Sequence, residues 1–195
     1  MDKAVLLLHT EPKDHNGQDL EAIVDELGMD EGQVYFSTTK LPAKDLSNFY
    51  SLADCTINIS DAEGFGLGTL ESLACETPII VNMTGGLQEQ VTDGEEWFGF
   101  GIEPCAKAVI GSQDVPYIDE DRISKEDFIS AMKSFIELSP QERSEMGKKG
   151  RNHVLKNYSM AQYAGLWYQT FQEVFDECGS WSERKNYKNW NIEEL

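Results

Sequence analysis

Residues 55–82, CTINISDAEGFGLGTLESLACETPIIVN, contain the pattern that decides the fold. The first six residues form an apolar run of strand length, and the loop that follows contains three glycines: Gly64, Gly66 and Gly68. The segment TLESLACE (69–76) favours a short helix, and PIIVN (78–82) has the composition of a buried strand. The stretch therefore predicts a strand, a glycine-rich turn, a helix and a second strand.

Strands and helices also alternate upstream of this stretch. Strands are predicted over residues 3–9 and 33–37, and helices over residues 17–29 and 42–55. Strands that are apolar throughout and alternate with helices indicate a parallel sheet that is covered on both faces. The sequence thus predicts an α/β fold with a Rossmann-like parallel β-sheet flanked by helices.

The chain beyond residue 94 has a different character. Residues 94–121 are predicted to be irregular apart from a short strand over 99–102, and loops of that length are usually functional or mobile. Helices are expected after this segment, over residues 124–138, 140–158 and 159–177.

The charge balance restricts the classes of partner. The chain has 35 Asp and Glu residues against 16 Lys and Arg, a net charge of −19, which argues against nucleic acid and anionic membranes. The apolar run near the start has only five residues, so we expect neither a signal peptide nor a transmembrane segment. The four cysteines form no C-x-x-C pair, which argues against a zinc site and favours a reducing, cytoplasmic location.

The glycine loop has the features of an anion-binding site. Backbone N–H groups that precede a helix attract anions, and glycines let a ligand approach the backbone closely. Ser60 ends the preceding strand, and ligands of parallel sheets bind at that end. Glu63 and Glu71 flank the loop, and carboxylates accept hydrogen bonds from hydroxyl groups, so we infer a phosphorylated sugar or nucleoside as the ligand. The alternative is that Glu63 is a solvated loop residue and Glu71 a charge in the first turn of the helix.

Two common nucleotide-binding motifs do not fit the loop. A dinucleotide fingerprint needs G-x-G-x-x-G, whereas the spacing here is G-x-G-x-G, and Asn82 is the nearest candidate for the acidic residue of the next strand. A P-loop needs Gly-Lys-Ser/Thr before its helix, and no such sequence follows.

Residues 60–94, SDAEGFGLGTLESLACETPIIVNMTGGLQEQVTDG, resemble the donor-binding signature of retaining GT-B glycosyltransferases of group 1 (GT4-type). Glu63 and Glu71 match the E-x7-E motif of that family. The resemblance continues upstream through YSLADCTINIS and downstream through MGKKGRNHVLKNYSMAQYA, and it covers roughly residues 3–178.

The resemblance implies a role for each residue of the motif. Glu71 would hold the ribose hydroxyls of a nucleotide-sugar donor, and Glu63, as the catalytic candidate, would contact hydroxyls of the donor sugar. The residues that would border the sugar and the diphosphate are Ser60, Gly64, Phe65, Gly66 and Leu67. Those that would lie beside the nucleobase are Thr38, Lys40 and Leu41. A Gly-Gly-x-x-Glu element that would shape the site is formed by Gly85, Gly86 and Glu89.

The resemblance also implies hexosyl transfer with retention at the anomeric carbon. N–H dipoles and positive groups would stabilise the leaving nucleoside diphosphate, because negative charge develops on it in the transition state. GT-B enzymes usually need no bound metal for this step, and the three histidines are scattered along the chain, so we expect no metal and no other cofactor.

Three residues depart from the family pattern. Gly68 stands where the family usually has proline, which loosens the loop entropically. Glu76 stands where it usually has glycine, near a helix C-terminus that often needs left-handed geometry. Thr38 replaces a common glycine beside the nucleobase.

The larger departure concerns what the chain does not contain. The family's donor half begins with a strand and helix that carry an Arg and a Lys for the diphosphate, and a separate N-terminal domain binds the acceptor. Lys40 and Lys44 do not match that basic pair. We expect residues 1–178 to form a donor-binding domain without this first unit, residues 179–195 to form a tail, and the chain to be inactive alone.

Three classes of function follow from these observations. The first is the donor-binding part of a glycosyltransferase. The second is a non-catalytic module that binds a nucleotide or nucleotide sugar. The third is a structural subunit of a split transferase, in which the last helix and the tail with Trp181 and Trp190 dock on a partner.

Overall fold

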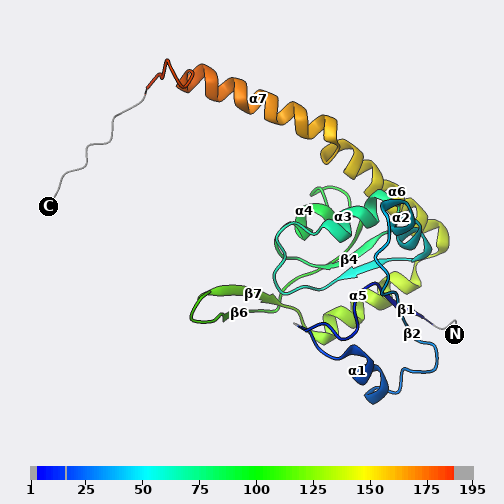
Figure 1. Ribbon diagram of the computed structural model, residues 1–195. Coiled ribbons are helices and arrows are strands. Elements are labelled where there is room, and N and C mark those ends of the chain that lie inside the picture. Colours follow the sequence, from blue (N-terminus) through cyan, green and yellow to red (C-terminus); the bar gives the residue numbers. More distant parts are fainter. Residues whose placement is uncertain (1–3, 16, 187–195) are drawn as a thin grey trace.

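The computed structural model describes residues 4–15 and 17–186, and it has the predicted α/β architecture (Figure 1). Its parallel strands are β1 (Leu6–Leu8), β2 (Val34–Phe36), β3 (Thr56–Asn58), β4 (Ile79–Asn82) and β5 (Gly99–Ile102). They form two hydrogen-bonded sheets, β1–β2 and β3–β4–β5. No backbone ladder joins either strand of the first sheet to β3 among the described residues, so the parallel strands lie in two hydrogen-bonded sheets.

The helices in chain order are α1 (Leu20–Glu26), α2 (Ala43–Leu52), α3 (Leu67–Ala74), α4 (Leu87–Val91), α5 (Lys125–Glu137), α6 (Pro140–Asn157) and α7 (Met160–Cys178). All except α4 were predicted. Helix α3 begins two residues before the predicted start, because Gly66 takes a left-handed conformation (φ 85°) at its N-cap. Glu71 therefore lies in the second turn of α3, and the expectation that it lies in the first turn was wrong.

Strand β4 is the centre of the core, and each of its four residues is buried. Ile79 and Val81 pack on one face with Leu73 of α3 and Leu87 of α4. Ile80 packs on the other face with residues that include Phe135 of α5. Figure 1 shows α3 and α4 on one side of β4 and α5 on the other, so this sheet is covered on both faces as predicted.

The segment predicted to be irregular contains an antiparallel hairpin. Its strands are β6 (Ala106–Ile110) and β7 (Ile118–Arg122), and it projects away from the sheet (Figure 1). The expectation of irregular structure failed here because β7, with the sequence IDEDR, lacks the apolar alternation of a strand. The pair is stabilised across the strands instead, in part by Lys107, whose Nζ lies 3.6 Å from Asp121 Oδ1.

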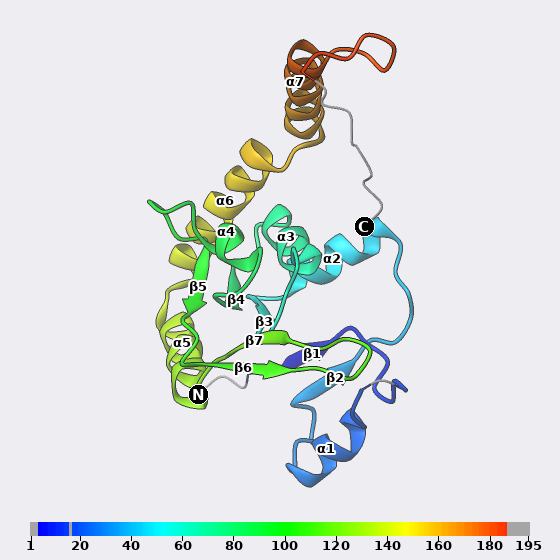
Figure 2. The same cartoon turned by 90° about the vertical axis from the view of Figure 1, so that its left-hand side faces the viewer.

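Helix α7 extends away from the rest of the structure, and none of its residues is buried (Figure 2). Within residues 4–15 and 17–186, no helix is both long and apolar enough to cross a membrane. In the tail, Trp181 is exposed and carries the guanidinium of Arg184 over its ring, 4.2 Å from the centroid. The second tryptophan of the predicted tail, Trp190, lies outside the described residues.

Glu76 follows the last turn of α3 with a φ of 63°, in the left-handed region. A side chain in that conformation is destabilised by about 1–2 kcal/mol. Helix α6 packs directly on this turn, since a Cβ added to Gly147 would lie 1.9 Å from the carbonyl oxygen of Glu76. The glycine that the family usually has at this position would therefore suit the observed backbone.

We predict that Glu76→Gly raises the free energy of unfolding by about 0.5–1 kcal/mol, because glycine adopts this φ without strain. Chemical denaturation measures the change. Glu76→Ala is the matched control, since it removes the carboxylate but keeps a Cβ at positive φ, and it should give no gain. A glycine variant that is no more stable than the alanine variant would contradict this account.

The cysteines differ in burial, and this predicts their reactivity. Cys55 and Cys75 are half-buried, whereas Cys105 and Cys178 are exposed, and all four are free thiols. Burial raises the pKa of the Cys55 thiol to about 11 from 9.0.

At pH 8 we expect a charged thiol reagent to label Cys178 rapidly in the folded protein. Cys55 should react far more slowly, because it is half-buried and its raised pKa lowers its thiolate fraction about 100-fold below that of a thiol with the ordinary pKa of 9.0. Mass spectrometry of timed samples measures both rates, and urea-unfolded protein is the control in which the rates converge. Equal rates in the folded protein would show that Cys55 is not shielded.

Candidate functional site

Two glycine-rich turns are packed against each other at the carboxyl ends of β3 and β4. The amide of Gly86 donates a hydrogen bond to the carbonyl oxygen of Gly64, with an N–O distance of 3.1 Å. A Cβ added to Gly85 would lie 1.7 Å from the carbonyl oxygen of Glu63, and one added to Gly86 would lie 2.7 Å from that of Phe65. Both glycines are thus required sterically for the two turns to meet.

A buried polar pair fixes the next two carbonyl groups of the loop. The side-chain amide of Gln90, on α4, donates to the carbonyl oxygen of Phe65 at 2.6 Å. The hydroxyl of Thr69 lies 2.6 Å from Gln90 Oε1 and 2.9 Å from the carbonyl oxygen of Gly66. Gln90 and Thr69 are at most 1% exposed. Neither residue was predicted to belong to the site, since each lies in a helix with nothing in its local sequence to mark it.

These contacts determine where the amide groups of the loop point. In a trans peptide the N–H is directed opposite to the preceding C=O, and the described residues contain no cis peptide. Because three consecutive carbonyl groups bond to the protein, the amides of Phe65, Gly66 and Leu67 are directed away from those acceptors.

The same amides lie at the start of α3, whose N-cap Gly66 offers no side chain. In the described part of the chain, none of the six amides from Gly64 to Thr69 donates to a protein acceptor. Backbone donors at a helix N-terminus with no partner of their own favour an anionic ligand.

The two glutamates stand on either side of these amides, and each has one protein donor. Glu71 is exposed, and its Oε2 accepts a hydrogen bond from the hydroxyl of Tyr50 at 3.0 Å. Glu63 is half-buried, and its Oε2 accepts from the side-chain amide of Asn58 at 3.3 Å. Neither carboxylate forms an ion pair with a described residue, so both keep lone pairs for ligand hydroxyl groups.

The β6–β7 hairpin is hydrogen-bonded to the same edge of the sheet as the glycine loop. The amide of Asp121 donates to the carbonyl oxygen of Asp61 at 2.7 Å, and its Oδ2 accepts from the hydroxyl of Thr84 at 2.8 Å. The buried side chain of Asn82 donates to the carbonyl oxygens of both Ser60 and Asp121, at 2.9 and 2.7 Å. Asn82 therefore ties β7 to the loop that precedes Glu63.

The structure does not join the predicted nucleobase residues to the glycine loop. Thr38 and Lys40 are exposed and Leu41 is half-buried, all in the connection between β2 and α2. Among the described residues, no hydrogen bond or ion pair links them to residues 60–71. The structure thus brings together Ser60, Glu63 to Leu67 and Glu71, and it leaves the nucleobase assignment a prediction.

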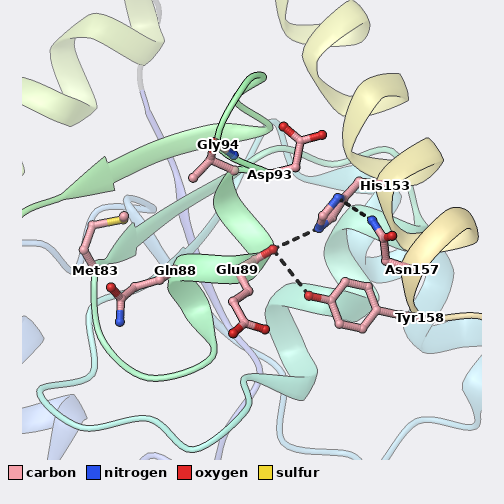
Figure 3. Close-up of a pocket in the computed structure, with 9 residues that line it drawn as sticks. Met83, Gln88, Glu89, Asp93, Gly94, His153, Asn157 and Tyr158 are labelled. Atoms are coloured by element: carbon pink, nitrogen blue, oxygen red, sulfur yellow. Dashed lines mark hydrogen bonds between the residues drawn. The ribbon is translucent and has the colours of Figure 1, made fainter. Parts of the chain in front are cut away.

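An open pocket of about 600 Å³ lies beside α4 (Figure 3). Its lining residues are Met83, Gln88, Glu89, Thr92, Asp93, Gly94, His153, Asn157 and Tyr158. The carbonyl oxygen of Glu89 accepts from His153 Nε2 at 2.9 Å and from the Tyr158 hydroxyl at 3.3 Å. The Tyr158 ring also meets Phe65 edge to face, with centroids 5.9 Å apart, so the pocket borders the glycine loop.

The side chain of His153 packs inside the fold. Its ring is buried and stacks on Phe98, with centroids 4.5 Å apart. The described residues include no group of three or more His, Cys, Asp or Glu side chains that could hold a metal ion.

Comparison with known proteins places this site in a family. The profile of the family described as "Glycosyl transferases group 1" matches residues 15–153. A D-inositol 3-phosphate glycosyltransferase from Acidothermus cellulolyticus is 40% identical over 76 residues, which cover 39% of this chain and 16% of that protein. A trehalose synthase from Rubrobacter xylanophilus is 29% identical over 125 residues, which cover 64% of this chain and 24% of that protein. The chain therefore spans only a minor part of the length of these relatives.

Solved structures show the same fold. Sucrose-phosphate synthase from Thermosynechococcus elongatus superposes with a TM-score of 0.66 at 23% identity, over 89% of this chain and 39% of that one. A glycosyltransferase from Rickettsia africae gives a TM-score of 0.65 at 17% identity, over 88% of this chain and 40% of that one. With a family profile that matches more than half of its residues, the chain belongs to the group 1 glycosyl transferases and has the fold of the C-terminal domain of a GT-B enzyme.

Proposed function

We propose that the chain is the donor-binding part of a glycosyltransferase that transfers a hexosyl group from a nucleoside diphosphate sugar with retention at the anomeric carbon. The observation that carries the proposal is the run of amides from Gly64 to Thr69, which have no protein acceptor within the described residues and lie between Glu63 and Glu71. A nucleoside diphosphate sugar has a diphosphate for the amides and hydroxyl groups on both sides of it for the two carboxylates.

The amides from Phe65 to Leu67 hold the diphosphate at the N-terminus of α3. Their dipoles are fixed by the bound carbonyl groups, so they stabilise the charge that develops on the leaving nucleoside diphosphate without reorganising. Glu71 accepts from the ribose hydroxyls, and Glu63 accepts from hydroxyls of the transferred sugar. The loop with Thr38, Lys40 and Leu41 borders the nucleobase.

The chain supplies little positive charge to this site. Arg122, on β7, is paired with Asp61, with an N–O distance of 3.0 Å, and also with Glu120. Lys40 and Lys44 form no ion pair with any described residue, and no contact brings them to the amides. We propose that a further part of the transferase, which binds the acceptor, also brings cations to the diphosphate, and that transfer requires it.

Helix α7 supports the existence of such a partner. It exposes a series of large apolar side chains: Met160, Tyr163, Leu166, Trp167, Tyr168, Phe171, Val174 and Phe175. In proteins most of the stability of a helix comes from packing of its apolar face, so a surface that covers this face is needed to hold α7. The matched relatives are several times longer than the matched segment, which supports an acceptor-binding part as that surface.

The donor site predicts a specific ligand response. In a thermal titration with UDP, GDP and ADP, we expect one nucleotide to stabilise the chain by about 2.7 kcal/mol at 100 times its dissociation constant. Glu71→Gln should abolish most of this effect, because it replaces an acceptor of two hydroxyl protons by a neutral amide. Glu137→Gln, an exposed glutamate at the end of α5, is the matched control and should respond like the natural chain. No stabilisation by any of the three nucleotides would contradict the donor site.

The exposed apolar face of α7 predicts that its large side chains bind a hydrophobic dye but contribute little to the free energy of unfolding of this chain. Trp167→Ser combined with Phe171→Ser should change the free energy of unfolding by less than about 0.5 kcal/mol, because neither side chain is buried. The same variant should bind less of a hydrophobic dye such as ANS. Phe98→Ser is the contrasting variant, since Phe98 is 2% exposed and its loss should destabilise the fold by about 3–5 kcal/mol. A large loss of stability in the α7 variant would show that α7 packs on the body of this chain.

Sugar transfer by the chain alone would overturn the proposed need for a partner.

A further inference from the structure

Tyr50 is the one described residue that holds the carboxylate of Glu71. Its hydroxyl, on α2, donates to Glu71 Oε2 at 3.0 Å, and Glu71 has no other side-chain hydrogen bond or ion pair within the described residues. A phenol–carboxylate hydrogen bond has an ionised acceptor and is stronger than a neutral one. It leaves Oε1 and part of Oε2 free to accept other donors.

Tyr50 is itself fixed in place. Its carbonyl oxygen accepts from the hydroxyl of Thr77 at 2.9 Å, and Thr77 is 3% exposed in the turn that connects α3 to β4. The residue thus bonds to the end of α3 through its backbone and to the middle of α3 through its side chain. Burial, together with the neighbouring Glu71, raises the pKa of the Tyr50 phenol far above neutral pH, so the hydroxyl remains a donor.

The start of α3 leaves room for this hydroxyl. A Cβ added to Gly68 would lie 3.4 Å from the Tyr50 hydroxyl oxygen, at the edge of ordinary contact. Gly68 and Glu71 are three residues apart on one face of α3, so the phenol lies over the same turn as the amides without a protein acceptor. The contact therefore orients Glu71 within the donor site and not on a remote surface.

We propose that Tyr50 is a positioning residue that orients the Glu71 carboxylate toward the two adjacent hydroxyl groups of ribose, and that it thereby sets the preference for ribonucleotides over 2′-deoxyribonucleotides. The proposal rests on the proposed function, since it assigns a ribose to Glu71. An exposed glutamate loses side-chain freedom when it binds, and a partner that orders it beforehand lowers that loss. Two adjacent hydroxyls need both carboxylate oxygens in one orientation, whereas a single hydroxyl is satisfied by either oxygen in several orientations, so this order favours ribose over 2′-deoxyribose.

The test compares ribose with 2′-deoxyribose for each base. Calorimetric titrations with UDP and dUDP, GDP and dGDP, and ADP and dADP give the affinity ratio of the natural chain and of its variants. We expect Tyr50→Phe to weaken binding of the preferred ribonucleotide about tenfold and to move the ratio toward one, because the lost bond is to a charged group. Tyr35→Phe is the matched control, an exposed phenol on β2 whose loss should leave affinity and ratio unchanged.

A second variant covers the case in which Tyr50→Phe disturbs the fold. Glu71→Asp keeps the charge but withdraws the carboxylate from the phenol by one methylene, and it should also move the ratio toward one. An unchanged ratio in Tyr50→Phe or in Glu71→Asp overturns the inference, whereas Glu71→Gln still tests the donor site by its loss of binding. If the natural chain binds none of the six nucleotides, the proposed function fails and the inference fails with it.

Discussion

The buried side chain of Gln90 is the contact on which the site depends. Its amide reaches from α4 to the carbonyl oxygen of Phe65, and its own oxygen meets the hydroxyl of Thr69 on α3. Gln90 is fully buried, and its side-chain amide would be destabilising by about 1–3 kcal/mol if it had no partner, so the carbonyl of Phe65 satisfies it. This bond fixes the direction of the Gly66 amide, because the N–H of a trans peptide points opposite to the preceding C=O. The bonds of Gly86 and Thr69 fix the amides of Phe65 and Leu67 in the same way.

The site has features that attract an anionic ligand although the chain as a whole is strongly negative. A chain with a net charge of −19 repels a diphosphate at long range, and the two carboxylates beside the loop add to this repulsion. Backbone dipoles act over short distances and carry no net charge, so they can attract phosphate oxygens while the glutamates accept hydroxyl protons. The arrangement suits a ligand that is both anionic and rich in hydroxyl groups.

The elements at the periphery are built differently from the core. The β6–β7 hairpin is anchored at its base, where Asp121 bonds to Asp61, Asn82 and Thr84, and its far end projects from the sheet. Helix α7 is capped by Ser159, but none of its residues is buried against the described part of the chain. A polar network thus fixes the base of the hairpin beside the glycine loop, whereas the apolar face of α7 is left uncovered by the described residues.

The sequence by itself determined the alternation of strands and helices, the glycine turn and the family, because apolar periodicity and turn residues are local signals within a few residues. It also marked Glu63, Glu71 and the strain at Glu76, each from its place beside a glycine turn or a helix end. Only the tertiary structure decided that Tyr50 holds Glu71 and that Gln90 holds Phe65, since these pairs are 21 and 25 residues apart and hydrogen bonds at that separation leave no periodic trace. The division of the strands into two sheets and the pairing of β6 with β7 were likewise decided in three dimensions, where partner strands and opposite charges meet.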